Sequence, residues 1–257
     1  MVKFKFKIVL SIALTAIFTA LVIILVRFLS IQNIAAIPFI RVSLGPTFII
    51  IAGLILGPIY GGIVGFLADL LGFFMFDASG FGYNPLISVT YLLYGLLAGL
   101  LVYIIRKNKK MKFPLIQLIL FVGMLIFMTY FFSTHDYIIL YKVTYELTDA
   151  LKVGFIAGGL LFSMIYFFLY FAFIGTVKTE EDKVLLNNIS AVLCLILIST
   201  QLFIGTAIKS AMFEVNFLFL FASQTIATLI EILLGSYIAF IVYLALKKYL
   251  KRYIEYK

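Results

Sequence analysis

Long apolar runs separated by short polar stretches dominate the first half of the chain. They occupy positions 8–26, 44–56, 59–76 and 85–105. A helix needs about 20 apolar residues to cross a bilayer, and three of these runs approach that length. The second run is shorter and ends at a Gly-Pro pair, so we expect a short helix that turns directly into the third.

The second half of the chain repeats this pattern. Further apolar runs cover positions 114–132, 153–175, 184–207 and 217–246. Together the runs predict about eight transmembrane helices joined by short connections. The expected fold class is an all-α membrane protein, a polytopic helical bundle that forms a single integral membrane domain over residues 1–257.

The composition supports a membrane-embedded chain and narrows its function. Hydrophobic residues make up 65% of the 257 residues and charged residues 12%, whereas soluble domains contain about 45–50% and 25%. These values exclude a soluble globular enzyme, a disordered chain and a nucleic-acid-binding domain, and they make the lipid bilayer a partner. The single cysteine, Cys194, lies in an apolar run, and we expect it to be a packing residue.

Basic residues set the orientation, because they collect in cytoplasmic loops. With the N-terminus inside, the segments 1–7, 106–112, 176–183 and 247–257 hold 15 of the 20 lysines and arginines. We therefore expect both termini in the cytoplasm. The first apolar run is long for a signal peptide and no clear small-residue cleavage site follows it, so we expect an uncleaved helix.

Charged residues at membrane depth suggest a polar site near the outer face. Asp69 and Glu231 lie inside apolar runs, and an ionisable group there normally faces a cavity or a partner. Arg27 and Arg41 bracket the first outer loop. One interpretation is an internal pair of Asp69 with either arginine. The other is a pocket for an anionic, aromatic ligand under the 27–43 and 77–84 loops. Its further candidate residues are Ser43, Tyr83, Asn84, Ser88 and Thr90.

Small residues repeat at helical spacing in two places. Glycines recur every fourth position over 53–65, with another pair in the fourth helix, which favours close helix packing. In the first helix Ala13, Ala16 and Ala20 share one face. That face either packs inside the protein or docks a partner.

The sequence lacks the familiar motifs for ATP hydrolysis, metal binding and nucleophilic catalysis. It contains no Walker A motif, no histidine-rich metal site and no Ser/His/Asp arrangement. The only histidine, His135, is followed by Asp136 in the polar stretch 133–152, and we expect the two to form a surface pair. We therefore expect no enzyme activity, no cofactor and no metal.

Several segments in order resemble the S components of energy-coupling factor (ECF) transporters, with the folate-type branch closest. They read LVRFLSI at 25–31, IRVS at 40–43, LGPIYGG at 56–62 and DLLG at 69–72, and YNP at 83–85 fits the fourth helix. More weakly, STQLF at 199–203 resembles a segment of that branch.

The resemblance implies a substrate-binding membrane subunit. Such a subunit captures a vitamin near the outer face of a prokaryotic plasma membrane and delivers it through a separate transmembrane T subunit and two ATPases. Ala13, Ala16 and Ala20 would dock the T subunit. The absent Walker motif agrees with ATP hydrolysis by separate subunits.

The chain also departs from the family pattern. The family core has six helices, which here would be 8–105 and 184–246, and a helix pair at 113–175 looks inserted. The folate branch has Pro-Gly-Phe-Thr where this chain has PLIS at 85–88, and Asn and Trp of the later segment are replaced by Ser199 and Phe203. These differences concern the substrate more than the fold.

Three hypotheses follow. The first is a vitamin-binding S component for folate or a related anionic compound. The second is a structural or assembly subunit without transport activity, whose glycines serve helix packing alone. The third is an intramembrane enzyme that uses Asp69 and Glu231, which lie on helices of opposite direction.

Overall fold

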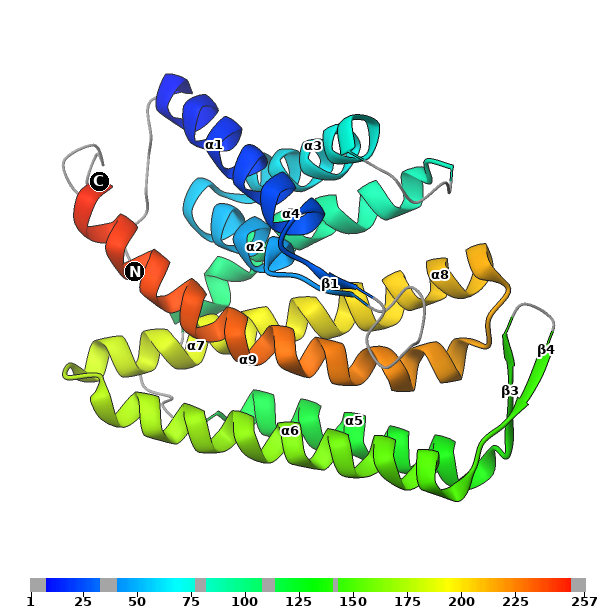
Figure 1. The fold of residues 1–257 in the computed structure, drawn as a ribbon. Helices are drawn as coiled ribbons and strands as arrows, with labels where there is room; N and C mark the ends of the chain where they lie inside the picture. The colour runs from blue at the N-terminus through cyan, green and yellow to red at the C-terminus, as the bar shows by residue number, and fades with distance from the viewer. Residues whose placement is uncertain (1–7, 33–40, 77–81, 108–113, 141–142, 251–257) are drawn as a thin grey trace.

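A computed structural model describes residues 8–32, 41–76, 82–107, 114–140 and 143–250. Helices dominate it (Figure 1). In chain order they are α1 (Ile8–Arg27), α2 (Gly45–Leu56), α3 (Pro58–Phe76), α4 (Pro85–Lys107), α5 (Leu115–Thr134), α6 (Asp149–Thr176), α7 (Glu180–Ile196), the π-helix η2 (Leu197–Gly205), α8 (Thr206–Phe213) and α9 (Phe217–Leu250).

The predicted all-α membrane fold is confirmed. Among the described residues, seven helical spans are long and apolar enough to cross a membrane, and α7, η2 and α8 form one of them, Glu180–Phe213. The remaining predicted helix, at 44–56, is α2, which has only 12 residues. The chain is therefore a multi-pass membrane protein with one helix of about half a span.

Glycines bring α2, α3 and α4 into direct backbone contact. A Cβ atom on Gly61 would collide with the backbone of Gly53 in α2, and a Cβ atom on Gly95 would collide with the backbone of Gly61. The turn between α2 and α3 is made by Gly57, whose φ of 96° lies in the region that favours glycine. The packing role predicted for the repeated glycines is thus visible in these contacts.

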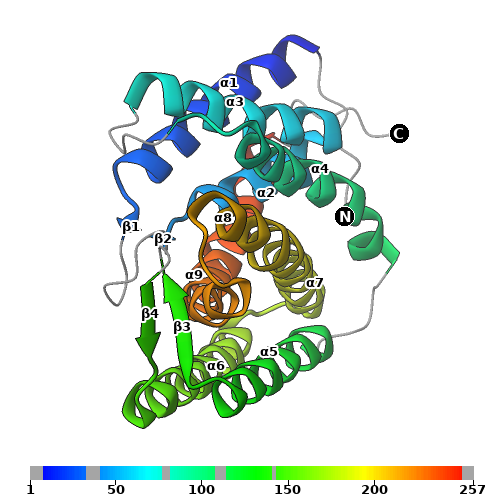
Figure 2. The ribbon, with the colours of Figure 1, turned by 90° about the vertical axis from the view of Figure 1, so that its right-hand side faces the viewer.

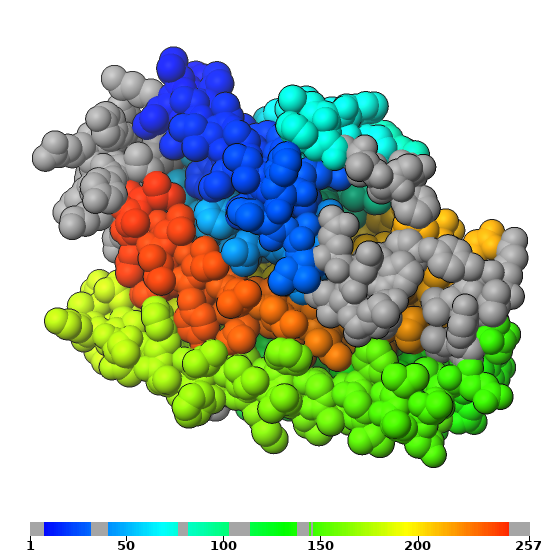
Figure 3. Space-filling view, viewed as in Figure 1, coloured from blue at the N-terminus to red at the C-terminus, as the bar shows by residue number. Residues whose placement is uncertain are grey.

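The helices form a layered arrangement (Figure 2). The first four helices lie on one side, the α7–α8 span and α9 run through the middle, and α5 and α6 lie on the other side. In the space-filling view α1 and α6 occupy opposite edges of the face, with α9 between them (Figure 3). The α5–α6 pair packs against α7 and α9.

Two short hairpins interrupt the described helices, and the sequence pattern predicted neither. The strands β1 (Ile31–Gln32) and β2 (Arg41–Val42) pair between α1 and α2, while β3 (Tyr137–Leu140) and β4 (Val143–Glu146) pair between α5 and α6. Residues 33–40, in the first predicted outer loop, lie outside the described residues. In Figure 1 the β3–β4 hairpin lies at the end of the bundle opposite the α6–α7 turn, and the β1–β2 hairpin lies nearer the middle.

Candidate functional site

A first buried polar network joins the ends of α1, α3 and α4. The guanidinium of Arg27 lies 3.8 Å from the Asp69 carboxylate. The Ser88 hydroxyl donates to the other carboxylate oxygen at 2.6 Å, and the Tyr83 hydroxyl lies 2.7 Å from the Ser88 oxygen. Asp69 and Ser88 are buried. The internal Arg27–Asp69 pair weighed from the sequence is therefore present.

A second network centres on Glu231 in α9. One carboxylate oxygen accepts the backbone N–H of Ser43 at 2.6 Å. The other accepts from the side-chain amide of Gln201 at 2.6 Å, and the Gln201 oxygen in turn accepts from the Tyr94 hydroxyl at 3.4 Å. A carboxyl group in the membrane needs such donors, and here two residues supply them: Ser43, just before α2, and Gln201 of η2.

Two cations lie close to this second network. The Arg41 guanidinium donates to the Tyr91 hydroxyl at 3.0 Å, and the Lys209 ammonium donates to the Gln224 oxygen at 3.0 Å. Tyr91 raises the pKa of Arg41, with Glu231 and Asp69 acting in the same direction against the effect of burial. Arg41 is therefore a permanent cation in the interior.

The aromatic rings beside these cations offer stacking surfaces. The rings of Tyr91 and Tyr94 meet edge to face at 5.7 Å, and both side chains are buried. Together the two networks combine two carboxyl groups, cations, amides and phenols, which is the chemistry needed to bind a polar aromatic molecule.

The structure distributes the predicted site residues unevenly. Arg27, Asp69, Tyr83 and Ser88 share the first network, and Arg41, Ser43 and Glu231 belong to the second. Asn84 and Thr90 make local bonds instead. The Asn84 side chain accepts the Leu86 N–H near the start of α4, and the Thr90 hydroxyl donates to the Leu86 carbonyl.

Sequence reasoning missed four members of the networks, namely Tyr91, Tyr94, Gln201 and Gln224. Gln201 points toward Glu231 from η2, and π-helical segments often occur at functional sites. A glutamine inside an apolar run was the available signal. The tyrosines gave none, because tyrosines are common in membrane helices at the interfaces.

The predicted docking alanines lie on an outward face of α1. Ala13, Ala16 and Ala20 are exposed, whereas Thr15 and Thr19 beside them are buried. An almost entirely apolar groove of ≈ 440 Å³ runs between α1 and α3. It is lined by Ile12, Thr15, Ala16, Thr19, Ala20, Ile23, Tyr60, Ile63, Leu67 and Leu71. The small residues thus face away from the protein's own core.

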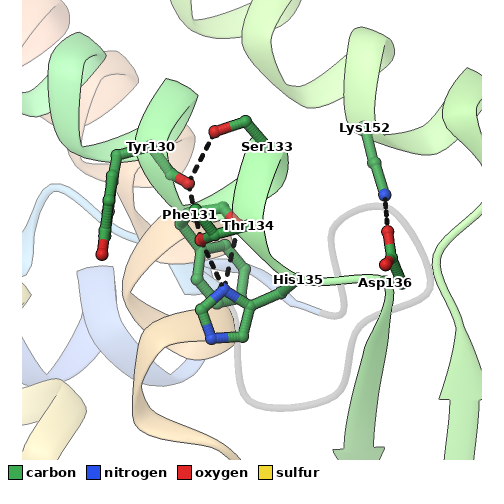
Figure 4. Close-up of polar contacts among 7 residues, drawn as sticks. All are labelled: Tyr130, Phe131, Ser133, Thr134, His135, Asp136 and Lys152. Carbon is green, nitrogen blue, oxygen red and sulfur yellow. Dashed lines mark hydrogen bonds and ion pairs between the residues drawn. The ribbon is translucent and has the colours of Figure 1, made fainter.

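The predicted contact between His135 and Asp136 is wrong, because the two side chains have different partners (Figure 4). The Asp136 carboxylate binds the Lys152 ammonium at 2.5 Å, and the His135 ring stacks on Phe131 and bonds to Thr134. The backbone at His135 is extended (φ −122°, ψ 124°), and successive side chains of an extended chain point to opposite sides. The hydrogen bond and charge of Lys152 lower the pKa of Asp136.

Metal binding finds no support in the described part of the chain. Within it, no group of three or more His, Cys, Asp or Glu side chains is arranged to hold a metal ion. Cys194 is a free, buried thiol that packs in the core, as expected.

The fold and the networks define a class. A bundle of membrane helices with one short helix and an internal cluster of ionisable side chains is the organisation of a membrane transport subunit. The chain belongs to the family of the ECF-type riboflavin transporter S component, whose family model matches residues 6–166. No curated protein and no solved structure matches the chain. The family is a substrate-binding subunit of a transporter and not an enzyme class.

Proposed function

We propose that this protein captures a vitamin near the outer face of a prokaryotic plasma membrane and delivers it through a separate T subunit and two ATPases. The observation that supports this best is the pair of buried polar networks around Asp69 and Glu231 in a chain of the S-component family. A purely structural bundle has no need for several ionisable groups in its interior, since each costs free energy there.

Riboflavin is the first candidate ligand, because the matching family is described by that vitamin. Its flat ring would stack on the phenol rings of Tyr91 and Tyr94. The amide of Gln201 and the hydroxyls nearby would meet its carbonyl and N–H groups.

Folate or a related anionic compound is the second candidate. The observation that favours it is the partly buried cation Arg41, which would bind a carboxylate of the ligand. Lys209, near the same network, adds a second positive charge. A neutral flavin makes less use of these charges than a folate does.

Docking of the T subunit is proposed at the exposed alanines of α1. Ala13, Ala16 and Ala20 allow a partner helix to approach closely, because small side chains let helix backbones come into contact. The groove between α1 and α3 extends this apolar surface. The opposite side of the protein carries α5 and α6, and we propose that this pair, predicted at 113–175, is an addition to a six-helix core of 8–105 and 184–246.

ATP-dependent uptake tests the proposal. The protein would be reconstituted in liposomes with a T subunit and the two ATPases, and accumulation of labelled riboflavin and of labelled folate would be followed. We expect one of them to accumulate only when ATP is present on the ATPase side. Accumulation of neither, although the purified complex hydrolyses ATP, would contradict the proposed transport of these vitamins.

A further inference from the structure

The segment before α2 is non-helical and largely buried: Arg41 and Val42 form the strand β2, and Val42 and Ser43 are buried. Helix α2 has 12 residues, so it spans about 18 Å at 1.5 Å per residue, against about 30 Å for the hydrocarbon core. The β1–β2 hairpin lies between α1 and α2. Non-helical backbone at membrane depth persists only where its polar groups find partners.

Three consecutive residues fix this segment to three helices. Arg41 donates to Tyr91 of α4. Val42 packs in a small apolar cluster with Ala227 and Ile230 of α9. These two contacts hold the strand β2 between α4 and α9.

Ser43, the third residue, makes hydrogen bonds through its backbone N–H and through its side-chain hydroxyl. Its N–H is held by Glu231 of α9. Its hydroxyl donates to the Leu25 carbonyl of α1 at 3.3 Å and accepts the Gly45 N–H at the start of α2. Ser43 therefore links the end of α1, the start of α2 and the middle of α9.

Glu231 contributes the carboxyl group of this arrangement. Its side chain is 2% exposed, and its two oxygens accept from Ser43 and from Gln201. The N-terminal end of a helix carries a partial positive charge and unsatisfied N–H groups. The Ser43 hydroxyl accepts one of these N–H groups, that of Gly45, and the carboxyl group of Glu231 holds Ser43 itself.

We propose that Glu231 is a positioning residue that fixes the segment 41–43 against α9 and η2, and thereby controls how fast a ligand enters and leaves the site. The part that concerns the ligand depends on the proposed function. The part that concerns the segment does not, because it follows from the contacts of Ser43 alone. Glu231 acts through the backbone of Ser43 and not by touching the ligand.

Backbone hydrogen exchange tests the positioning role without any ligand. In Glu231→Leu the Ser43 N–H loses its acceptor, and we expect exchange at residues 41–45 to become about tenfold faster, since hydrogen bonds to charged groups are the stronger kind. Thr225→Val is the matched control. Thr225 is fully buried in the same helix, and its hydroxyl bonds only to the Phe221 carbonyl of its own helix.

Glu231→Gln is the second variant, because it keeps the side-chain volume and one acceptor oxygen for Ser43. We expect it to fold and to exchange at a rate between the wild-type protein and Glu231→Leu. Exchange at 41–45 that stays at the wild-type rate in both variants would overturn the proposal. So would a rise that is equal in 41–45, α4 and α9, because that would indicate general destabilisation.

Binding kinetics with riboflavin and with folate as probes test the second part. For whichever probe binds, both the association and the dissociation rate should increase in Glu231→Leu, with a smaller change in affinity. A residue that contacts the ligand would change mainly the dissociation rate, and that result would overturn the indirect role. If the wild-type protein binds neither probe, riboflavin and folate are wrong as proposed ligands. Hydrogen exchange still tests whether Glu231 positions the segment 41–43.

Discussion

Gly95 lies where α4 crosses α3 so closely that the two backbones touch. A Cβ atom there would collide with the carbonyl of Gly61, whereas a Cβ atom on Gly123 in α5 would meet nothing within 4 Å. We predict that Gly95→Ala destabilises the protein by about 1–3 kcal/mol, the usual cost of overpacking. Gly123→Ala, the matched control, should be neutral or slightly stabilising. Thermal unfolding in detergent measures both, and equal stability of the two variants would contradict the close packing.

Arg41 is the partly buried cation that the proposed ligand site depends on most. We predict that Arg41→Ala weakens vitamin binding by about tenfold or more, because hydrogen bonds to charged groups contribute about 1.5–3 kcal/mol. Lys152→Ala removes another outer cation, one that binds the exposed Asp136, and should leave affinity unchanged. Titration calorimetry measures both variants. Unchanged affinity in Arg41→Ala would remove this residue from the site.

At the scale of single residues, the sequence located the ionisable groups but could assign few of their partners. An Asp69 pair with Arg27 was one of two interpretations, because both residues lie near the outer ends of neighbouring helices. The partner of Glu231 is the backbone of Ser43, 188 positions away, and no pattern in the sequence reports a backbone N–H. Gln201 was missed because a π-helix changes which side chains point inward.

The small-residue face of α1 carries the prediction for partner docking. We predict that Ala16→Leu and Ala20→Leu abolish uptake while ligand binding by the isolated protein stays intact, because a bulky side chain blocks close helix contact. Ala157→Leu, at an exposed position of α6, is the control and should support normal uptake. Loss of binding in the α1 variants would mean that this face serves the protein's own fold.

Asn187 joins the α5–α6 pair to the rest of the bundle. Its side-chain oxygen accepts from Tyr170 of α6 at 3.1 Å and from Gln117 of α5 at 3.3 Å, and all three residues are buried or nearly so. Asn187→Leu would leave both donors without this acceptor. We predict a loss of about 1–3 kcal/mol in unfolding free energy, the cost of an unsatisfied buried group.

Ser199→Ala is the control for Asn187→Leu, because the Ser199 hydroxyl bonds only to carbonyls of its own helical span. It should leave the unfolding transition nearly unchanged. Chemical unfolding followed by circular dichroism measures both variants. Equal stability of the two would show that the polar contact does not hold the helix pair in place.

Among whole elements, the helices were predictable and the hairpins were not. Each apolar run became a helix, because a chain in lipid must satisfy its backbone polar groups internally. The helix predicted at 153–175 begins earlier, at Asp149, where Thr148 accepts the Leu151 N–H as a cap. In the 133–152 stretch the strands β3 and β4 pair with each other. Such pairing adds no apolar run to the sequence pattern, so the pattern did not predict the hairpin.

The molecule as a whole combines a short second helix with a layer of two helices, α5 and α6, that packs against α7 and α9. The membrane class followed from the apolar runs and the composition, and the transporter family from the order of several weak motifs. The matching family points to riboflavin, and the partly buried cations favour an anionic folate. Only a bound ligand distinguishes these two.

Isothermal titration of the purified, ligand-stripped protein with riboflavin, folate, thiamin and biotin tests the central claim most directly. Calorimetry suits this chain because it contains no tryptophan as an intrinsic reporter. We predict tight binding of one vitamin, riboflavin or folate, with a heat signal that falls in Arg41→Ala. A well-folded sample that binds none of the four would contradict a vitamin-capturing subunit for these substrates.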